Sequence, residues 1–161
     1  MNVKNKIIVV DSCILLYCEA HPTKLEIRKL LRTLVDNKNR LVISELSGFE
    51  VMKNAKTENR GYFIKLLDYI PSISIDKNIL ANSVLLYDRY ESKKINHYKK
   101  ISAGDYLIGG TTLSIKNSLL LTSNRADFCR PIWKIYEHQY ITYKLGEKQE
   151  LLNFYLLEYT I

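Results

Sequence analysis

The sequence predicts an α/β fold with a central short parallel sheet and helices on both faces. Short unbroken apolar runs alternate with longer amphipathic stretches, as buried parallel strands alternate with their crossover helices. The 161 residues include 47% hydrophobic ones, enough for one substantial core. Only six Gly and three Pro are present, which excludes a collagen-like or low-complexity chain. We therefore expect one domain over residues 1–161.

The first half of the chain contains three predicted strands. They lie at residues 7–10, at residues 41–43 and, as a small edge strand, at residues 72–75. Apolar residues at helical spacing predict a helix over residues 25–35, which makes a β-α-β unit with the strands on either side. Two further helices follow the second strand. The first runs through Met52, and Pro71 ends the second.

The second half begins with two predicted helices whose N-caps are Asp76 and Ser102. The first is expected to turn Leu80, Val84 and Tyr87 inward. On the packing side of the second lie Leu107, Ile108, Thr111 and Ile115. Within that helix Gly109 and Gly110 cost helix propensity, but they let another backbone come close.

Residues 119–121 form the next predicted strand, and one more is expected at residues 132–136 or 139–143. The end of the chain is predicted to be a helix on the spacing of Leu151, Leu152, Tyr155, Leu156 and Tyr159. We expect the extension over residues 137–161 to pack on the domain, with an interaction surface as the alternative.

Composition also limits the compartment and the kind of site. No apolar run approaches the roughly 18 to 20 residues of a membrane span, and the run IIVV is too short for a signal peptide. We therefore expect a cytoplasmic protein without a membrane partner. Three cysteines without C-x-x-C spacing argue against a disulfide framework and a zinc site, and indicate reduced packing residues.

The formal net charge is +7, and much of it lies between residues 89 and 100. Tyr90 and Tyr98 lie among the basic residues of this segment, a mixture suited to phosphate pairing and base stacking. A solvated helix end is the alternative interpretation. The candidate RNA-binding residues are Arg89, Lys93, Lys94, Lys99 and Lys100.

Acidic residues follow the predicted strands at the points where those strands end. Beyond the carboxyl ends of parallel strands is where binding sites of such sheets gather. Clustered carboxylates repel one another unless a cation lies among them, and oxygen ligands without His or Cys suit Mg²⁺ or Mn²⁺. Each acid alone has a structural alternative as a cap or turn residue. The acids are Asp11, Glu45, Glu50, Asp105 and Asp127, with Asn124 beside the last.

Four segments resemble, in order, the four motifs of PIN-domain ribonucleases, especially VapC-type toxins. They are VVDSCILL, ISELSGFEVM, SAGDYLIGGTTL and LLLTSNRADF, within residues 7–128. The second motif of the family places its acid after a Ser-x-x-Ser/Thr-x-x pattern, which selects Glu50 over Glu45. These two lie about 140° apart around a helix, so both cannot easily face one site. The double alanine usual after the third acid appears here as Gly109-Gly110.

The resemblance implies a Mg²⁺- or Mn²⁺-dependent endoribonuclease, the toxin of a toxin–antitoxin pair. It implies an antitoxin partner and a possible homodimer. A non-catalytic RNA- or protein-binding module is the alternative, and Ser12 has no neighbouring His to make it a nucleophile. The acids implied in metal binding and catalysis are Asp11, Glu50, Asp105 and Asp127. Hydrogen-bond donors that orient these carboxylates are expected at Ser12, Thr122, Ser123 and Asn124.

Overall fold

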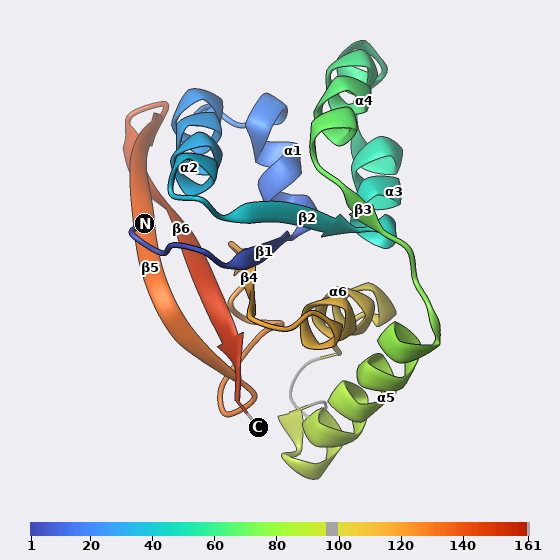
Figure 1. Ribbon diagram of the computed structural model, residues 1–161. Helices are drawn as coiled ribbons and strands as arrows, with labels where there is room; N and C mark the ends of the chain where they lie inside the picture. Colours follow the sequence, from blue (N-terminus) through green and yellow to red (C-terminus); the bar gives the residue numbers. More distant parts are fainter. Residues whose placement is uncertain (96–99, 161) are drawn as a thin grey trace.

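The computed structural model describes residues 1–95 and 100–160, and Figure 1 shows them around a central sheet. Within these residues the sheet has six strands in the order β3-β2-β1-β4-β6-β5. Neighbouring strands are parallel from β3 to β4, whereas β6 is antiparallel to both β4 and β5. The strands are β1 (Ile7–Val10), β2 (Arg40–Ser44), β3 (Ser72–Ile73), β4 (Ser118–Thr122), β5 (Trp133–Leu145) and β6 (Lys148–Tyr159).

Helices cover both faces of the sheet, as predicted (Figure 1). One core cluster contains Ile8 and Val10 of β1 together with apolar residues of the first four helices. The other contains Val9 and apolar residues of the last two. Because alternate residues of a strand point to opposite faces, β1 is buried on both sides. The helices are α1 (Ser12–Ala20), α2 (Lys24–Asp36), α3 (Glu45–Asn54), α4 (Arg60–Tyr69), α5 (Lys77–Ser92) and α6 (Ala103–Ser114), with a 3₁₀ turn, η1 (Thr57–Asn59), before α4.

The predicted N-caps of α5 and α6 are both present. The Asp76 side chain accepts a hydrogen bond from the backbone N–H of Ile79 at 2.9 Å. Ser102 and Asp105 form a reciprocal capping box, in which each side chain accepts from the other residue's backbone N–H. These contacts fix where the two helices begin.

Gly109 and Gly110 bring α5 and α6 into close contact, as predicted. A Cβ on Gly110 would lie 2.1 Å from Oγ of Ser83 and 2.8 Å from the carbonyl oxygen of Ile79, and one on Gly109 would lie 2.4 Å from Cδ2 of Leu86. Only glycine allows the helix backbones to approach so closely.

The predicted inward face of α5 is wrong by one residue. Leu80, Val84 and Tyr87 are about half exposed, whereas the buried positions are Ile79, Ser83, Leu86 and Tyr90. A shift of one residue is a rotation of about 100°. The physical reason is the contact with α6, because the small Ser83 side chain lies where Gly110 makes the closest approach.

The predicted C-terminal helix is also wrong, because residues 133–159 form a long antiparallel hairpin. Leu145 pairs with Lys148, so the turn is the two residues Gly146 and Glu147, and Gly146 has φ +64°. Such a turn with a positive φ suits a two-residue hairpin. The two alternative strands expected at residues 132–136 and 139–143 belong to the single strand β5, which has a bulge between Ile135 and Glu137.

The spacing of apolar residues near the C-terminus fits both a helix and a strand that is buried on two faces. In the structure Phe154 and Leu156 face one core cluster, and Leu157 faces the other.

No helix within the described residues is both long enough and apolar enough to cross a membrane.

Candidate functional site

Asp11 lies at the carboxyl edge of the sheet, directly after β1. Its backbone N–H donates to the carbonyl oxygen of Leu121 at 3.0 Å, so the end of β4 holds it in place. Its side chain is only 4% exposed. A buried carboxylate needs hydrogen bonds or a cation to offset the loss of water.

Three side chains donate hydrogen bonds to the Asp11 carboxylate. Thr122 Oγ1 donates to Oδ2 at 2.6 Å, and Cys13 Sγ donates to the same oxygen at 3.2 Å. Ser12 Oγ donates to Oδ1 at 3.3 Å. Ser123 Oγ in turn donates to Cys13 Sγ at 3.2 Å. Thr122, Ser12 and Ser123, which the sequence analysis names as orienting residues, therefore lie around Asp11.

Glu50 and Asp105 reach the same edge from α3 and α6. Glu50 Oε1 lies 2.9 Å from where a Cβ on Gly104 would be, so it contacts the first turn of α6. Asp105 is the third residue of that helix. Burial raises the pKa of Asp11 above its ordinary value, and the charges of Asp105 and Glu50 raise it further, against the hydrogen bonds from Thr122 and Cys13. The charges of two other predicted acids, Asp105 and Glu50, therefore act on Asp11.

Ser44 and Ser47, the serines of the second motif, are fully buried at the end of β2 and in α3. Their hydroxyls have no hydrogen-bond partner within residues 1–95 and 100–160. Buried hydroxyls are ordinarily hydrogen-bonded, so these two serines are exceptions.

Glu45 lies apart from this group. It begins α3, it is exposed, and its Oε2 accepts a hydrogen bond from the backbone N–H of Ile75 at 3.3 Å. This contact turns Glu45 toward the segment after β3. The expectation that Glu45 and Glu50 face different directions is confirmed.

Asp127 lies in the loop after β4 and is linked to Asp11 through two residues. Asn124 Nδ2 donates to the Asp127 carboxylate, and the Asn124 backbone N–H donates to Thr122 Oγ1 at 2.9 Å. Tyr90 OH donates to the Asp127 carbonyl oxygen at 2.7 Å and ties the loop to α5. Asn124 therefore orients Asp127 while Thr122 orients Asp11.

The side chains at this edge offer the kind of ligand atoms that a hard divalent cation prefers. Carboxylate and hydroxyl oxygens dominate. Burial first, and then the charges of Asp105 and Glu50, raise the pKa of Asp11, and a bound cation would stabilise its charged form. As they stand, no three His, Cys, Asp or Glu side chains among the described residues lie close enough together to hold a metal ion.

Part of the basic segment lies between the end of α5 and the start of α6. Lys93 and Lys94 are exposed at the end of α5, and Lys100 is exposed two residues before the N-cap of α6. Asp105 lies in the first turn of α6, five residues after Lys100. The predicted residues Tyr98 and Lys99 lie outside the described residues.

Two other members of that segment lie elsewhere. The Arg89 guanidinium lies 5.4 Å from the ring centre of Tyr159 and lines a groove of about 460 Å³ with Lys6 and Asn117, which precede β1 and β4. That groove is at the opposite edge of the sheet. Tyr90 is 1% exposed, so its predicted role in base stacking is wrong, because its ring fills the core.

Cys13 and Gly104 at this edge were not among the predicted site residues. Cys13 was predicted to be a packing residue, although its place in the first helical turn after Asp11 lets its side chain reach back to Asp11. Burial raises the pKa of its thiol to about 12, so Cys13 stays a hydrogen-bond donor at neutral pH. For Gly104 no signal was available, since only the fold places it against Glu50.

Neither a family model nor a curated protein matches the chain. Solved structures match its fold. A chain of VapBC2 from Rickettsia felis, bound to a DNA fragment from its promoter, has a TM-score of 0.60 and 23% identity, covering 76% of this chain and 90% of that one. A toxin–antitoxin complex from Klebsiella pneumoniae gives 0.60 and 22%, covering 77% and 92%. VapBC-1 from nontypeable Haemophilus influenzae gives 0.58 and 20%, covering 76% and 90%.

Proposed function

We propose that this protein is a divalent-metal-dependent endoribonuclease and the toxin of a toxin–antitoxin pair. The observation that carries the proposal is that Asp11, buried at the carboxyl edge of the sheet, is under the influence of the charges of Asp105 and Glu50, which add to burial in raising its pKa. The fold, shared with chains of VapBC toxin–antitoxin complexes, supports it. A fold alone does not give a function, so the acidic residues carry the chemistry.

The acids would hold one or two Mg²⁺ or Mn²⁺ ions, with Asp11, Glu50, Asp105 and Asp127 as ligands. When bound, such an ion neutralises charge on phosphoryl oxygens and favours deprotonation of a water. The remaining residues position the ligands. Thr122, Cys13 and Ser12 fix the Asp11 carboxylate by hydrogen bonds, and Asn124 does the same for Asp127.

RNA as the substrate is supported by charge. The chain carries a net +7, and Lys93, Lys94 and Lys100 are exposed in the connection that leads to α6 and Asp105. Lysines pair with backbone phosphates, while the acids themselves repel RNA unless a cation is bound. The arrangement therefore suits an RNA strand held beside the acids by the lysines.

An antitoxin partner follows from the same site. The uncovered acids create a local negative potential within a basic protein, and a basic side chain of a partner would neutralise it. One of the solved structures that share the fold is itself a toxin–antitoxin complex. Formation of a homodimer is part of this proposal.

A non-catalytic binding module is the second candidate. It is favoured by one observation, since no three potential ligands within residues 1–95 and 100–160 are close enough to hold a metal ion without movement. Such a module would bind RNA at the lysines and leave it uncut.

Cleavage by the purified full-length protein separates these candidates. We expect single-stranded RNA to be cut in Mg²⁺ or Mn²⁺, to stay intact in excess EDTA, and to stay intact with Asp11→Asn in either buffer. Equal cutting in EDTA would show that the metal mechanism is wrong. RNA that binds but stays intact in Mg²⁺ and in Mn²⁺ would favour the binding module.

The toxin role is tested by expression in a bacterial host. We expect the wild-type chain to arrest growth and Asp11→Asn, expressed at the same level, to relieve the arrest. Harmless accumulation of folded, RNA-cleaving wild-type protein would leave a nuclease without a toxin role.

A further inference from the structure

The β5–β6 hairpin extends past the acidic edge of the sheet. Only three residues of β4 pair with β6, the last pair being Thr122 and Tyr155, whereas β5 and β6 stay paired as far as Leu145 and Lys148. The hairpin between Tyr155 and its turn therefore lies beyond the carboxyl end of β4. Figure 1 shows it as the long orange and red ribbon beside α2.

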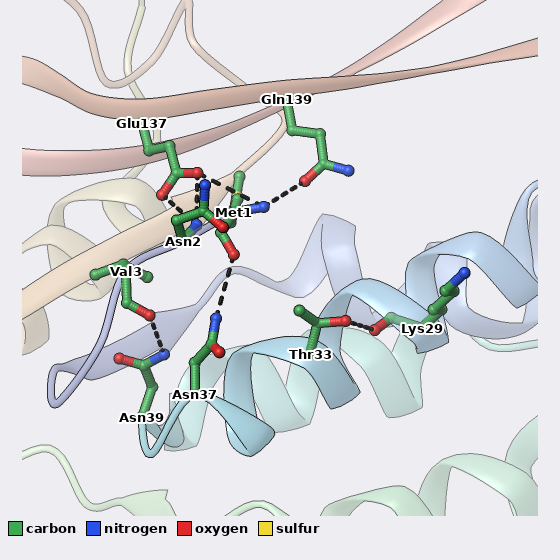
Figure 2. Close-up of polar contacts among 9 residues, drawn as sticks. All are labelled: Met1, Asn2, Val3, Lys29, Thr33, Asn37, Asn39, Glu137 and Gln139. Atoms are coloured by element: carbon green, nitrogen blue, oxygen red, sulfur yellow. Dashed lines mark hydrogen bonds and ion pairs between the residues drawn. The ribbon is translucent and has the colours of Figure 1, made fainter.

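One face of this extension is covered. Ile141 and Leu152 pack against the core cluster that includes α1 and α2, and the ring of Tyr143 lies 4.7 Å from the ring of His21. Nearer its base the same face holds the N-terminal residues, as Figure 2 shows: Glu137 accepts from the Asn2 backbone N–H at 2.7 Å.

The opposite face is open to solvent and aromatic. The rings of His138 and Tyr155 stack with centres 4.7 Å apart and planes 10° apart, and the next ring, Tyr140, is 60% exposed. The strand register places no acid on this face, because Glu137 and Glu150 point to the covered side. From the base to the turn the open face carries His138, Tyr155, Tyr140, Asn153, Thr142, Leu151, Lys144 and Gln149.

This face begins at the acidic edge itself. Tyr155 pairs with Thr122, which donates to Asp11 at 2.6 Å. Arg125 of the loop after β4 donates to the carbonyl oxygen of Trp133, the first residue of β5, at 3.1 Å. Lys144 adds a second positive charge near the turn. Rings and cations therefore continue outward from the site.

We infer that this open face binds single-stranded RNA that leads into the acidic edge, with bases stacked on the rings of His138, Tyr155 and Tyr140. We call it the hairpin platform. Every base has a π-face, so aromatic rings bind bases without strict sequence preference, and Arg125 and Lys144 suit the phosphates. The lack of acids and the continuity with the site favour RNA over a protein partner. The inference rests on the proposed function, whose substrate path it names.

Binding of a fluorescent single-stranded RNA by the full-length Asp11→Asn protein tests this. In that background, Tyr140→Leu should raise Kd about tenfold, the effect of losing one base–aromatic contact. Tyr140→Phe keeps the ring and should bind like the parent. Tyr143→Leu removes the same side chain from the covered face of the same strand and should change Kd less than about twofold.

A second measurement asks whether bases make the contact. The same RNA with abasic positions flanking the cleavage point should bind the parent about tenfold more weakly, and Tyr140→Leu should then add no further loss. An unchanged Kd for Tyr140→Leu on intact RNA, or equal losses for Tyr140→Leu and Tyr143→Leu, would overturn the inference. If Tyr140→Leu bound RNA like the parent but eluted as a smaller oligomer on gel filtration, the open face would instead bind a second copy of the chain.

The failure of this inference and the failure of the proposed function are distinguishable. If the wild-type protein cuts RNA in Mn²⁺ and Tyr140→Leu binds RNA normally, the nuclease proposal stands and the hairpin platform is wrong. If the wild-type protein never cuts RNA but its binding still depends on the rings, the nuclease proposal is wrong and the hairpin platform stands.

Discussion

The Asp11 carboxyl group is buried and is influenced by the charges of two other acids, so its ionisation affects the stability of the fold. Its pKa in the folded protein is raised above the ordinary value of 3.8, first by burial and then by Asp105 and Glu50. The folded state therefore holds the Asp11 proton more tightly than the unfolded chain does. As pH rises above 3.8, the unfolded chain loses the Asp11 proton before the folded protein does, and the free energy of unfolding falls. This loss of stability is complete once the pH exceeds the raised pKa of the folded protein.

We predict that Asp11→Asn stabilises the metal-free protein at pH 7, because a neutral amide carries no charge into the buried site. The expected gain is about 1 kcal/mol, or about 2 to 4 °C in Tm for a domain of this size. The difference should shrink as pH falls toward 3.8. Thermal unfolding in EDTA across that pH range measures it, and a gain that persists unchanged below pH 3.8 would contradict the explanation.

The two glutamates of α3 form a matched pair. Glu50→Gln should abolish RNA cleavage or reduce it at least about 100-fold, the scale on which an orienting or ligand group matters. Glu45→Gln should leave the rate within about twofold, because Glu45 is exposed and bonded to the Ile75 backbone instead. Rates of single-turnover cleavage compare them. Equal losses in the two variants would show that α3 presents a different face to the site.

At the scale of elements, the contact between α5 and α6 depends on the absence of side chains. Gly110→Ala should cost about 2 kcal/mol, because its Cβ would meet the backbone of α5, which cannot move aside as a flexible side chain can. Gly61→Ala in α4 is the control, with nothing within 4 Å of the added Cβ, and should gain up to about 1 kcal/mol. Urea unfolding measures both. A stabilising Gly110→Ala would contradict the packing.

The lysines that flank α6 support a separate prediction. Lys93→Ala, Lys94→Ala and Lys100→Ala combined should weaken RNA binding and lower the slope of log K against log salt by roughly 0.7 for each lost phosphate contact. Arg89→Ala, at the opposite edge of the sheet, should leave the slope unchanged. Binding titrations at several salt concentrations decide this. If the triple variant keeps the parent slope, the lysines are only a solvated helix end.

Most elements could be predicted because their signals are local. A short apolar run such as residues 7–10 gives a strand, and Asp76 or Ser102 gives the start of a helix. The rotation of α5 could not be predicted, since it depends on where Gly110 approaches Ser83 from another helix. The hairpin was missed because the apolar residues of its second strand also fit a helical spacing, whereas Gly146, with its positive φ, forms the turn; these residues are Leu151, Leu152, Tyr155, Leu156 and Tyr159.

For the whole molecule, parallel strands made the acidic edge predictable. Once β1, β2 and β4 run the same way, the residues after them meet at one edge. Residues that are close in the sequence were predicted to share one surface, and this was wrong where the fold turns them to different edges of the sheet. Arg89 precedes Lys93 by only four residues, yet its side chain lines the groove at the other edge. Cys13 was assigned to packing, whereas it donates a hydrogen bond to Asp11.

The most direct test of the account is the binding of Mn²⁺ to the metal-free protein, measured by calorimetry and by the shift in Tm. The account predicts that Mn²⁺ binds the wild-type chain and, at about 100 times Kd, stabilises it by about 2.7 kcal/mol. It predicts that Asp11→Asn and Glu50→Gln lose this binding while Glu45→Gln keeps it. Wild-type protein that binds no Mn²⁺, or Asp11→Asn protein that binds it equally well, would contradict the assignment of the acidic edge as a metal site.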